Sequence, residues 1–149
     1  MKIKIPQPLK LEHKELHAEL VKATRAGGKT GAAAKTVANV LHDHFVKEEE
    51  FALPPLGLLP LLARGKIDKE MRGVVAMTDR LKTELPDMLR EHRAVVAALK
   101  KLIAAAKKEK LPEHVSFAEN LMLHAQTEEE VLYPAAILVG EYVKVKLDI

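Results

Sequence analysis

The sequence predicts an all-α protein that folds as an antiparallel up-down four-helix bundle, and three observations lead to that prediction. The composition is 48% hydrophobic but only 3% aromatic, and it is rich in Ala, Leu, Lys and Glu, which favour helices. Apolar residues recur at helical spacing in four long segments. A pattern of His and Glu occurs twice along the chain. With 149 residues the chain has the size of a single domain, and we expect the bundle to span about residues 9–136.

The first two helices are expected at residues 9–26 and 30–52. Gly27 and Gly28 end the first helix, Thr30 is a good N-cap for the second, and Pro54 stops it. The inward face of the first helix carries His13, Leu16, His17, Leu20 and Ala23. The inward face of the second carries Val37, Val40, Leu41, His44, Glu48 and Phe51. We expect His42, nearly opposite His44, to be solvated.

Residues 53–67 form an apolar connection with several prolines. We interpret it as a cluster that seals one end of the bundle; the alternatives are an entrance lid or an oligomer contact. Helical pattern resumes at about Asp68 and continues to Lys108, and Pro86 implies a kink or a restart there.

The inward face of this third helix carries Leu85, Met88, Leu89, His92, Val95, Val96, Leu99, Leu102 and Ile103. The fourth helix is expected to begin at Pro112. Its inward face carries Phe117, Leu121, His124, Glu128 and Val131, before Pro134 bends or breaks it. His114, in the first turn, is expected to be solvated.

Both ends of the chain show apolar residues at every second position, in residues 2–5 and 142–147. This period is typical of strands. A small pair of terminal strands and a fraying helical extension fit the pattern about equally well.

The composition also excludes several classes of protein. The net charge of +3 comes from 24 basic and 21 acidic residues dispersed along the chain. No aromatic residues are interleaved with the basic ones for base stacking, so we expect no nucleic-acid partner. The start has no apolar signal region, and the apolar stretch 51–63 is too short to span a bilayer, so a soluble cytoplasmic protein is favoured. Cysteine is absent, which excludes disulfides, Fe–S ligation and thiol catalysis within the chain.

The repeated pattern itself points to a metal site. His44 is followed by Glu48 and by Pro54, and His124 by Glu128 and by Pro134 at the same spacing. Residues four apart lie on one side of a helix, so each pair presents an imidazole and a carboxylate together. A Glu-His pair precedes each copy, at Glu12-His13 and Glu91-His92.

Ionised carboxylates in apolar stripes need a partner, and a metal supplies one, because iron accepts imidazole and carboxylate ligands and helical bundles hold two-metal sites. The predicted metal ligands are His13, His44, Glu48, His92, His124 and Glu128. His17 is left open as an extra ligand, a hydrogen-bonding group near the bound ligand, or a core residue. We expect Glu49, Glu50, Glu129 and Glu130 to be exposed, while Glu49 or Glu129 can support a ligand from outside.

This arrangement resembles the hemerythrin-like HHE cation-binding domain family over about residues 9–136. The resemblance implies a four-helix bundle around two non-haem Fe ions with an oxo or hydroxo bridge, with Glu48 and Glu128 bridging the irons. Val96 stands where oxygen-carrying hemerythrins have another His, and Glu129 where they have Asp. The six-ligand pattern is more similar to di-iron proteins of nitric oxide response and iron-centre repair, which usually carry an additional cysteine-containing segment.

Three functions follow as hypotheses. The leading one is a module that binds or senses O2 or NO. The second is an oxidoreductase acting on peroxide or NO, with an electron donor, or an iron-centre repair protein. The third is a bundle that holds metal for storage or structure. The sequence leaves the oligomeric state open.

Overall fold

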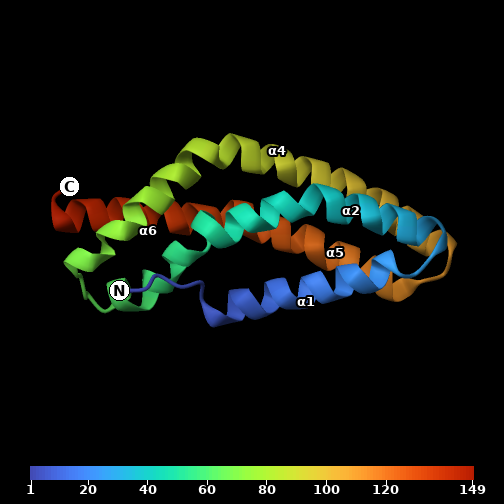
Figure 1. Cartoon of the computed structure of the whole chain (residues 1–149), viewed down its shortest axis with the longest axis horizontal. Coiled ribbons are helices and arrows are strands. Elements are labelled where there is room, and N and C mark those ends of the chain that lie inside the picture. Colours follow the sequence, from blue (N-terminus) through green and yellow to red (C-terminus); the bar gives the residue numbers. More distant parts are fainter.

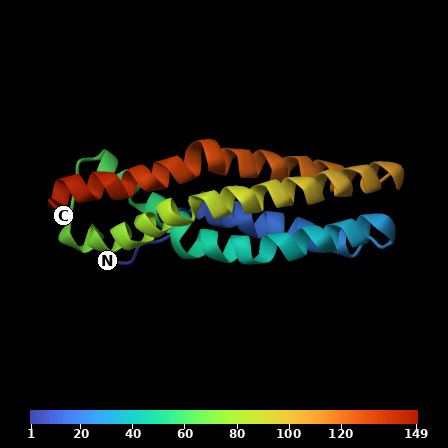
Figure 2. The same cartoon turned by 90° about the horizontal axis from the view of Figure 1, so that it is seen from above.

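The protein is built of helices that lie side by side along its long axis (Figures 1 and 2). A computed structural model describes all 149 residues, and it contains no strand. The long helices are α1 (Gln7–Thr24), α2 (Gly28–Lys47), α4 (Gly73–Lys108), α5 (Pro112–Thr127) and α6 (Tyr133–Leu147). A π-helical turn, η4 (Glu128–Leu132), joins α5 to α6 without a break. The chain therefore forms four long helical segments, which confirms the all-helical prediction.

The two short connections, residues 25–27 and 109–111, lie together at one end of the molecule. Glu109 accepts hydrogen bonds there from the backbone N–H of Thr30 (2.7 Å) and from the Thr30 hydroxyl (2.5 Å). The prediction that Thr30 caps the second helix was wrong, because α2 already begins at Gly28, after Gly27 with φ of 73°. Thr30 instead binds the two connections to each other.

The connection between α2 and α4 is helical almost throughout. It contains a second π-helical turn, η1 (Glu48–Ala52), the 3₁₀ helix η2 (Pro54–Leu58), the short helix α3 (Leu59–Ala63) and the 3₁₀ helix η3 (Lys69–Arg72). Leu53, Leu56 and Leu58 are buried in it. Residues 59–67, by contrast, are exposed or half-buried, so the apolar cluster that we expected over residues 53–67 forms only in its first part.

The alternating residues at the termini do not form strands. Residues 142–147 belong to α6, and residues 1–6 precede α1 without regular structure. The alternation arises because α6 is apolar on opposite sides: Val143 is buried, whereas Val145 is 78% exposed. Residues two apart on a helix differ by roughly 200° in direction, so both sides receive a Val.

The prolines inside the long segments do not end them. Pro86 lies within α4, which continues as one bent helix (Figure 1). Pro134 stands at the start of α6, directly after η4. Of the bend or break that we expected at Pro134, the break is absent, because the preceding π-helical turn accommodates the proline.

The core consists of three apolar clusters along the bundle. One contains Leu41, Leu99 and Leu121, and the next contains Phe51, Met88 and Tyr133. The third lies around Val74 and Val143. On each of the later three segments, the repeated His and Glu residues occur between members of the first and the second cluster, so these polar side chains are enclosed by apolar layers.

Candidate metal centre

The two carboxylates of the repeat each begin a π-helical turn. The backbone N–H of Leu53 donates to the Glu48 carbonyl (2.9 Å), and that of Tyr133 donates to the Glu128 carbonyl. A proline follows each of these donors. Proline has no N–H, and its ring clashes with the preceding turn of an α-helix. The wider π-helical turn has room for the ring, so the motif can end in proline without ending the helix. Such turns are frequent at functional sites.

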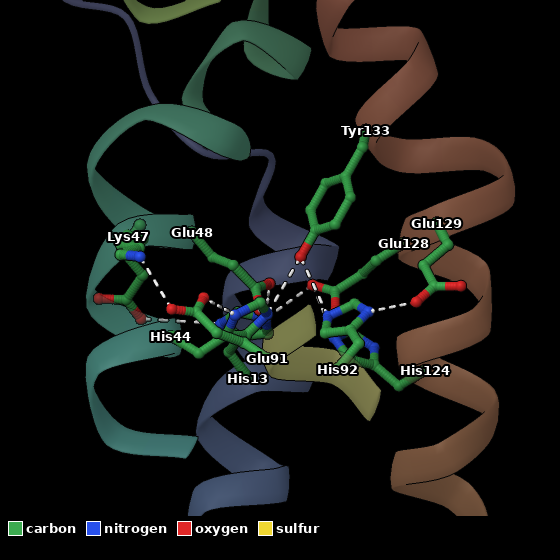
Figure 3. A network of polar contacts seen from close by, with 11 residues as sticks. His13, His44, Lys47, Glu48, Glu91, His92, His124, Glu128, Glu129 and Tyr133 are labelled. Atoms are coloured by element: carbon green, nitrogen blue, oxygen red, sulfur yellow. Dashed lines mark hydrogen bonds and ion pairs between the residues drawn. The ribbon is translucent and has the colours of Figure 1, made fainter. Parts of the chain in front are cut away.

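All six predicted ligands meet in the interior. Their side-chain nitrogen and oxygen atoms form two groups of four, and within each group the ligand atoms lie within 4.8 Å of one another. One group is His13, Glu48, His124 and Glu128, and the other is His44, Glu48, His92 and Glu128. Figure 3 shows the side chains converging from separate helices. Both carboxylates belong to both groups, as two bridging ligands would.

The distances place each carboxylate between two imidazoles. Glu48 lies 2.7 Å from His44 Nε2 through Oε1 and 3.3 Å from His13 Nε2 through Oε2. Glu128 lies 3.3 Å from His92 Nε2 through Oε1 and 3.3 Å from His124 Nε2 through Oε2. Both glutamates are buried.

Several of these buried atoms have no hydrogen-bond partner. They include both oxygens of Glu48, both ring nitrogens of His13, His124 Nε2 and Glu128 Oε2. Leaving such groups unpaired costs about 1–3 kcal/mol each. Cations between the carboxylates and imidazoles would satisfy them, so the residues fit a pair of metal ions.

The remaining nitrogens of the histidines meet a second set of carboxylates. His44 Nδ1 lies 2.8 Å from Glu91, and His92 Nδ1 lies 3.0 Å from Glu129. A carboxylate on Nδ1 holds the proton there and leaves Nε2 free to face the centre. These contacts orient the two rings of one metal group.

In the other group one ring is supported in the same way, because Glu12 accepts from His124 Nδ1. Glu49 lies 3.8 Å from His13 Nδ1, which is too long for a hydrogen bond. Each outer carboxylate is adjacent in sequence to a ligand but lies beside a ligand on another helix. These outer carboxylates come from the two Glu-His pairs and from the second Glu of each Glu-Glu-Glu run. Sequence reasoning considered a supporting role for Glu49 and Glu129 but not for Glu12 or Glu91.

Burial and the neighbouring carboxylates have opposite effects on the pKa of His13 and of His44. Burial disfavours the charged ring of His13 and of His44, but the contacts with Glu48 outweigh it and raise the pKa of both imidazoles. Burial alone would raise the pKa of Glu48, yet the same two rings lower it to about 2. Without metal, protons on these two imidazoles balance the Glu48 charge.

The other two histidines behave differently. Burial lowers the pKa of His92 and of His124 and outweighs the attraction of their carboxylate neighbours. The ring of His44 also disfavours charge on His92. These two imidazoles are therefore neutral at neutral pH, which is the state that binds a metal.

Tyr133 is a site residue that sequence reasoning missed. Its hydroxyl lies 3.2 Å from His44 Nε2 and 3.1 Å from His92 Nε2 (Figure 3). Burial, followed by the Glu48 carboxylate, raises its pKa above the usual range, so the hydroxyl stays protonated. The two copies differ at this position, with Tyr133 before Pro134 and Leu53 before Pro54, and that difference was the available signal.

Other histidines fall partly outside the predictions. His17 is exposed, so the expectation that both histidines of the first helix point inward was wrong. His114 is buried rather than solvated, whereas His42 is exposed as predicted. Val131 is 56% exposed and not on the inward face, because the π-helical turn changes the angle between residues 128 and 131.

A cleft with a volume of about 510 Å³ lies between α1 and α2, and His13 and Phe45 line it. His13 is the one predicted ligand that it reaches. Phe45 stacks on the His13 ring with 4.6 Å between centroids. The rim carries Lys10, Lys14, His17 and His42.

No family model, curated protein or solved structure matches this chain. None of the helices has the length and apolar character required to cross a membrane. The functional argument therefore depends on the geometry of the site.

Proposed function

We propose that this chain is a non-haem di-iron protein of the hemerythrin-like HHE type, an antiparallel bundle that binds or senses O2 or NO. The observation that carries the proposal is the pair of four-residue groups that share Glu48 and Glu128. His13 and His124 would hold one iron, and His44 and His92 the other. When bound, the irons supply open coordination positions for a small diatomic ligand.

Iron is favoured over zinc by the number and kind of ligands. Each group offers two imidazoles and two carboxylates, which suits iron. Four ligands would complete a tetrahedral zinc site and leave no open position. The same four leave an iron ion with room for further ligands, which a binding function needs.

The surrounding residues suit a small ligand. The apolar clusters on both sides limit the entry of water, and the cleft beside Phe45 provides a route from the surface. If His44 Nε2 and His92 Nε2 hold a metal, the Tyr133 hydroxyl loses both of its present partners. The buried hydroxyl would then be free to donate a hydrogen bond to a polar ligand at the centre.

Metal analysis combined with optical spectroscopy tests this proposal. The chain is purified in air, reduced without oxygen, and then exposed to O2 or NO. We expect about two irons per chain and charge-transfer bands that change reversibly with the ligand. Continuous consumption of peroxide or NO would indicate the enzyme instead, with an electron donor. Zinc without such bands would contradict the proposal and favour a structural or storage site.

A further inference from the structure

Helix α6 is apolar on two opposite sides. One side, which includes Ala136 and Val143, is buried in the bundle. On the other side Leu138 is 66% exposed, Val145 78% and Tyr142 40%. A helix that is apolar all round is normally covered all round, and within the chain nothing covers this outer side.

The outer residues follow a regular spacing. Leu138, Tyr142 and Val145 follow one another at intervals of four and three residues, and the half-buried Ala135 stands three residues before Leu138. This is the spacing of a coiled-coil seam, in which one narrow stripe of a helix faces a partner helix. Apolar residues that are exposed singly on a surface have no such order.

The seam lies beside a groove. Leu59, Leu62 and Ala63 of α3 line the groove together with the seam residues, and its volume is about 640 Å³. Apolar grooves of this kind receive helices. The required partner is therefore a helix with an apolar stripe.

The charges beside the seam identify that helix. Glu141 directly precedes Tyr142, and Lys146 directly follows Val145, so they flank the seam on its two sides. In a parallel pair of helices, the residue on the flank of Glu141 faces the partner's residue that is five positions further along, on the flank of Lys146. Glu141 and Lys146 are five apart, so two copies of α6 would form this ion pair twice. An antiparallel pair that overlaps all four seam residues would instead bring the two Glu141 side chains together.

We propose that the chain forms a two-fold symmetric dimer in which the α6 seams of two copies pack in parallel. The interface is self-complementary, as two-fold symmetry requires. The seam supplies the apolar contacts, α3 borders them, and Glu141 and Lys146 set the direction. This proposal does not depend on the metal or on the proposed function.

Sedimentation velocity of the full chain over a range of concentrations tests the contact. We expect wild type to sediment as a dimer of the 16.5 kDa chain. Leu138→Glu should raise the dissociation constant at least about tenfold, as expected for a central apolar residue. Leu123→Glu is the matched control, because Leu123 is 62% exposed but lies on α5, outside the groove; it should leave the dissociation constant unchanged.

A charge exchange tests the direction. Glu141→Lys and Lys146→Glu should each weaken the dimer, and the double variant should restore it. Glu141 also contacts Lys82 (2.9 Å) and Lys144 (3.5 Å) in its own chain. Those contacts are lost in both Glu141 variants, so recovery in the double variant identifies Lys146 of the other copy as the partner.

Cross-linking gives an independent readout. The chain has no cysteine, so Leu138→Cys introduces a single thiol without background. In the parallel dimer it faces its own equivalent, and mild oxidation should give a covalent dimer, whereas Leu123→Cys should not. A monomeric wild type at tens of micromolar would overturn the proposal, and so would a dimer equally insensitive to both Glu substitutions. Failure of Leu138→Cys to cross-link would overturn the parallel arrangement.

Discussion

At the scale of residues, the site depends on six side chains that are polar and buried. His44→Ala or Glu128→Ala removes a ligand and leaves the facing groups unpaired, so we expect each variant to lose most of its bound metal and about 1–3 kcal/mol of stability. Metal content by mass spectrometry and the free energy of unfolding measure the two effects. His42→Ala is the control, because His42 is exposed two residues from His44. Full metal content in both ligand variants would contradict the assignment.

The outer carboxylates provide a finer test at the same scale. Glu129 lies 3.0 Å from His92 Nδ1. Its neighbour Glu130 is equally on the surface and contacts no ligand. Glu129→Gln should lower metal affinity about 10–100-fold, because the orientation and basicity of the imidazole depend on this partner. Glu130→Gln should leave the affinity unchanged. Affinities come from competition with a chelator of known strength, and equal values for the two variants would exclude the supporting role of Glu129.

The pKa shifts predict how metal binding depends on pH. The pKa of His13 and of His44 is raised, so in the metal-free chain both rings still carry protons at and somewhat above pH 6.5, and metal must displace them. Each iron displaces one of these protons, so where the rings are protonated the affinity for each iron should rise about tenfold per pH unit. Glu48, with a pKa of about 2, stays ionised and adds no proton. Chelator competition between pH 5 and 8 measures how steeply the metal affinity rises with pH. If the affinity changed around pH 4 instead, the groups that release protons would be carboxylates rather than these imidazoles.

At the scale of elements, the sequence was sufficient for what periodicity encodes. The apolar stripes predicted four helices. They also predicted that the six ligands lie on the inward-facing sides of those helices. Their spacing could not reveal the π-helical turns, because i to i+5 hydrogen bonding leaves no period of its own over five residues. It also could not separate strand from helix at residues 142–147, where the Val residues alternate because both sides of α6 are apolar. Tyr133 was missed because a lone aromatic residue in an apolar run reads as a core residue, and only its replacement by Leu53 in the other copy of the motif sets it apart.

The contact between α4 and α6 depends on a glycine. A Cβ at Gly140 would overlap the side chain of Thr78, which is buried in α4. Gly140→Ala should therefore destabilise the chain by about 1–3 kcal/mol, although alanine is intrinsically the better helix former. At Gly73, in α4, an added Cβ would meet only Ile3 at an ordinary 3.8 Å, so Gly73→Ala is the matched control and should be neutral or stabilising. Denaturant unfolding measures both, and equal stability of the two variants would show that α6 shifts without cost.

At the scale of the whole molecule, the site conflicts with the stability of the bundle. Two carboxylates and four imidazoles lie between apolar clusters, where burying charge is unfavourable without a partner. The metal-free chain satisfies part of this need with protons on His13 and His44, but several buried atoms remain unpaired. The fold therefore retains residues that weaken it unless they bind something, which is the pattern expected of a functional centre.

Metal should consequently contribute to the stability of the entire chain. At a free metal concentration 100 times the dissociation constant, each bound iron adds about 2.7 kcal/mol to the free energy of unfolding. Two irons therefore add about 5.4 kcal/mol, which for a chain of this length corresponds to about 10–20 °C in melting temperature. Calorimetry of chelator-stripped protein, titrated without oxygen with ferrous iron, measures the increase. The variant His44→Leu is the control, because it replaces a ligand with an apolar side chain. It should melt below stripped wild type, because the buried Glu48 loses the His44 imidazole as a partner, and it should gain little from iron. If wild type gained no more from iron than this variant, the buried cluster would not be a metal centre.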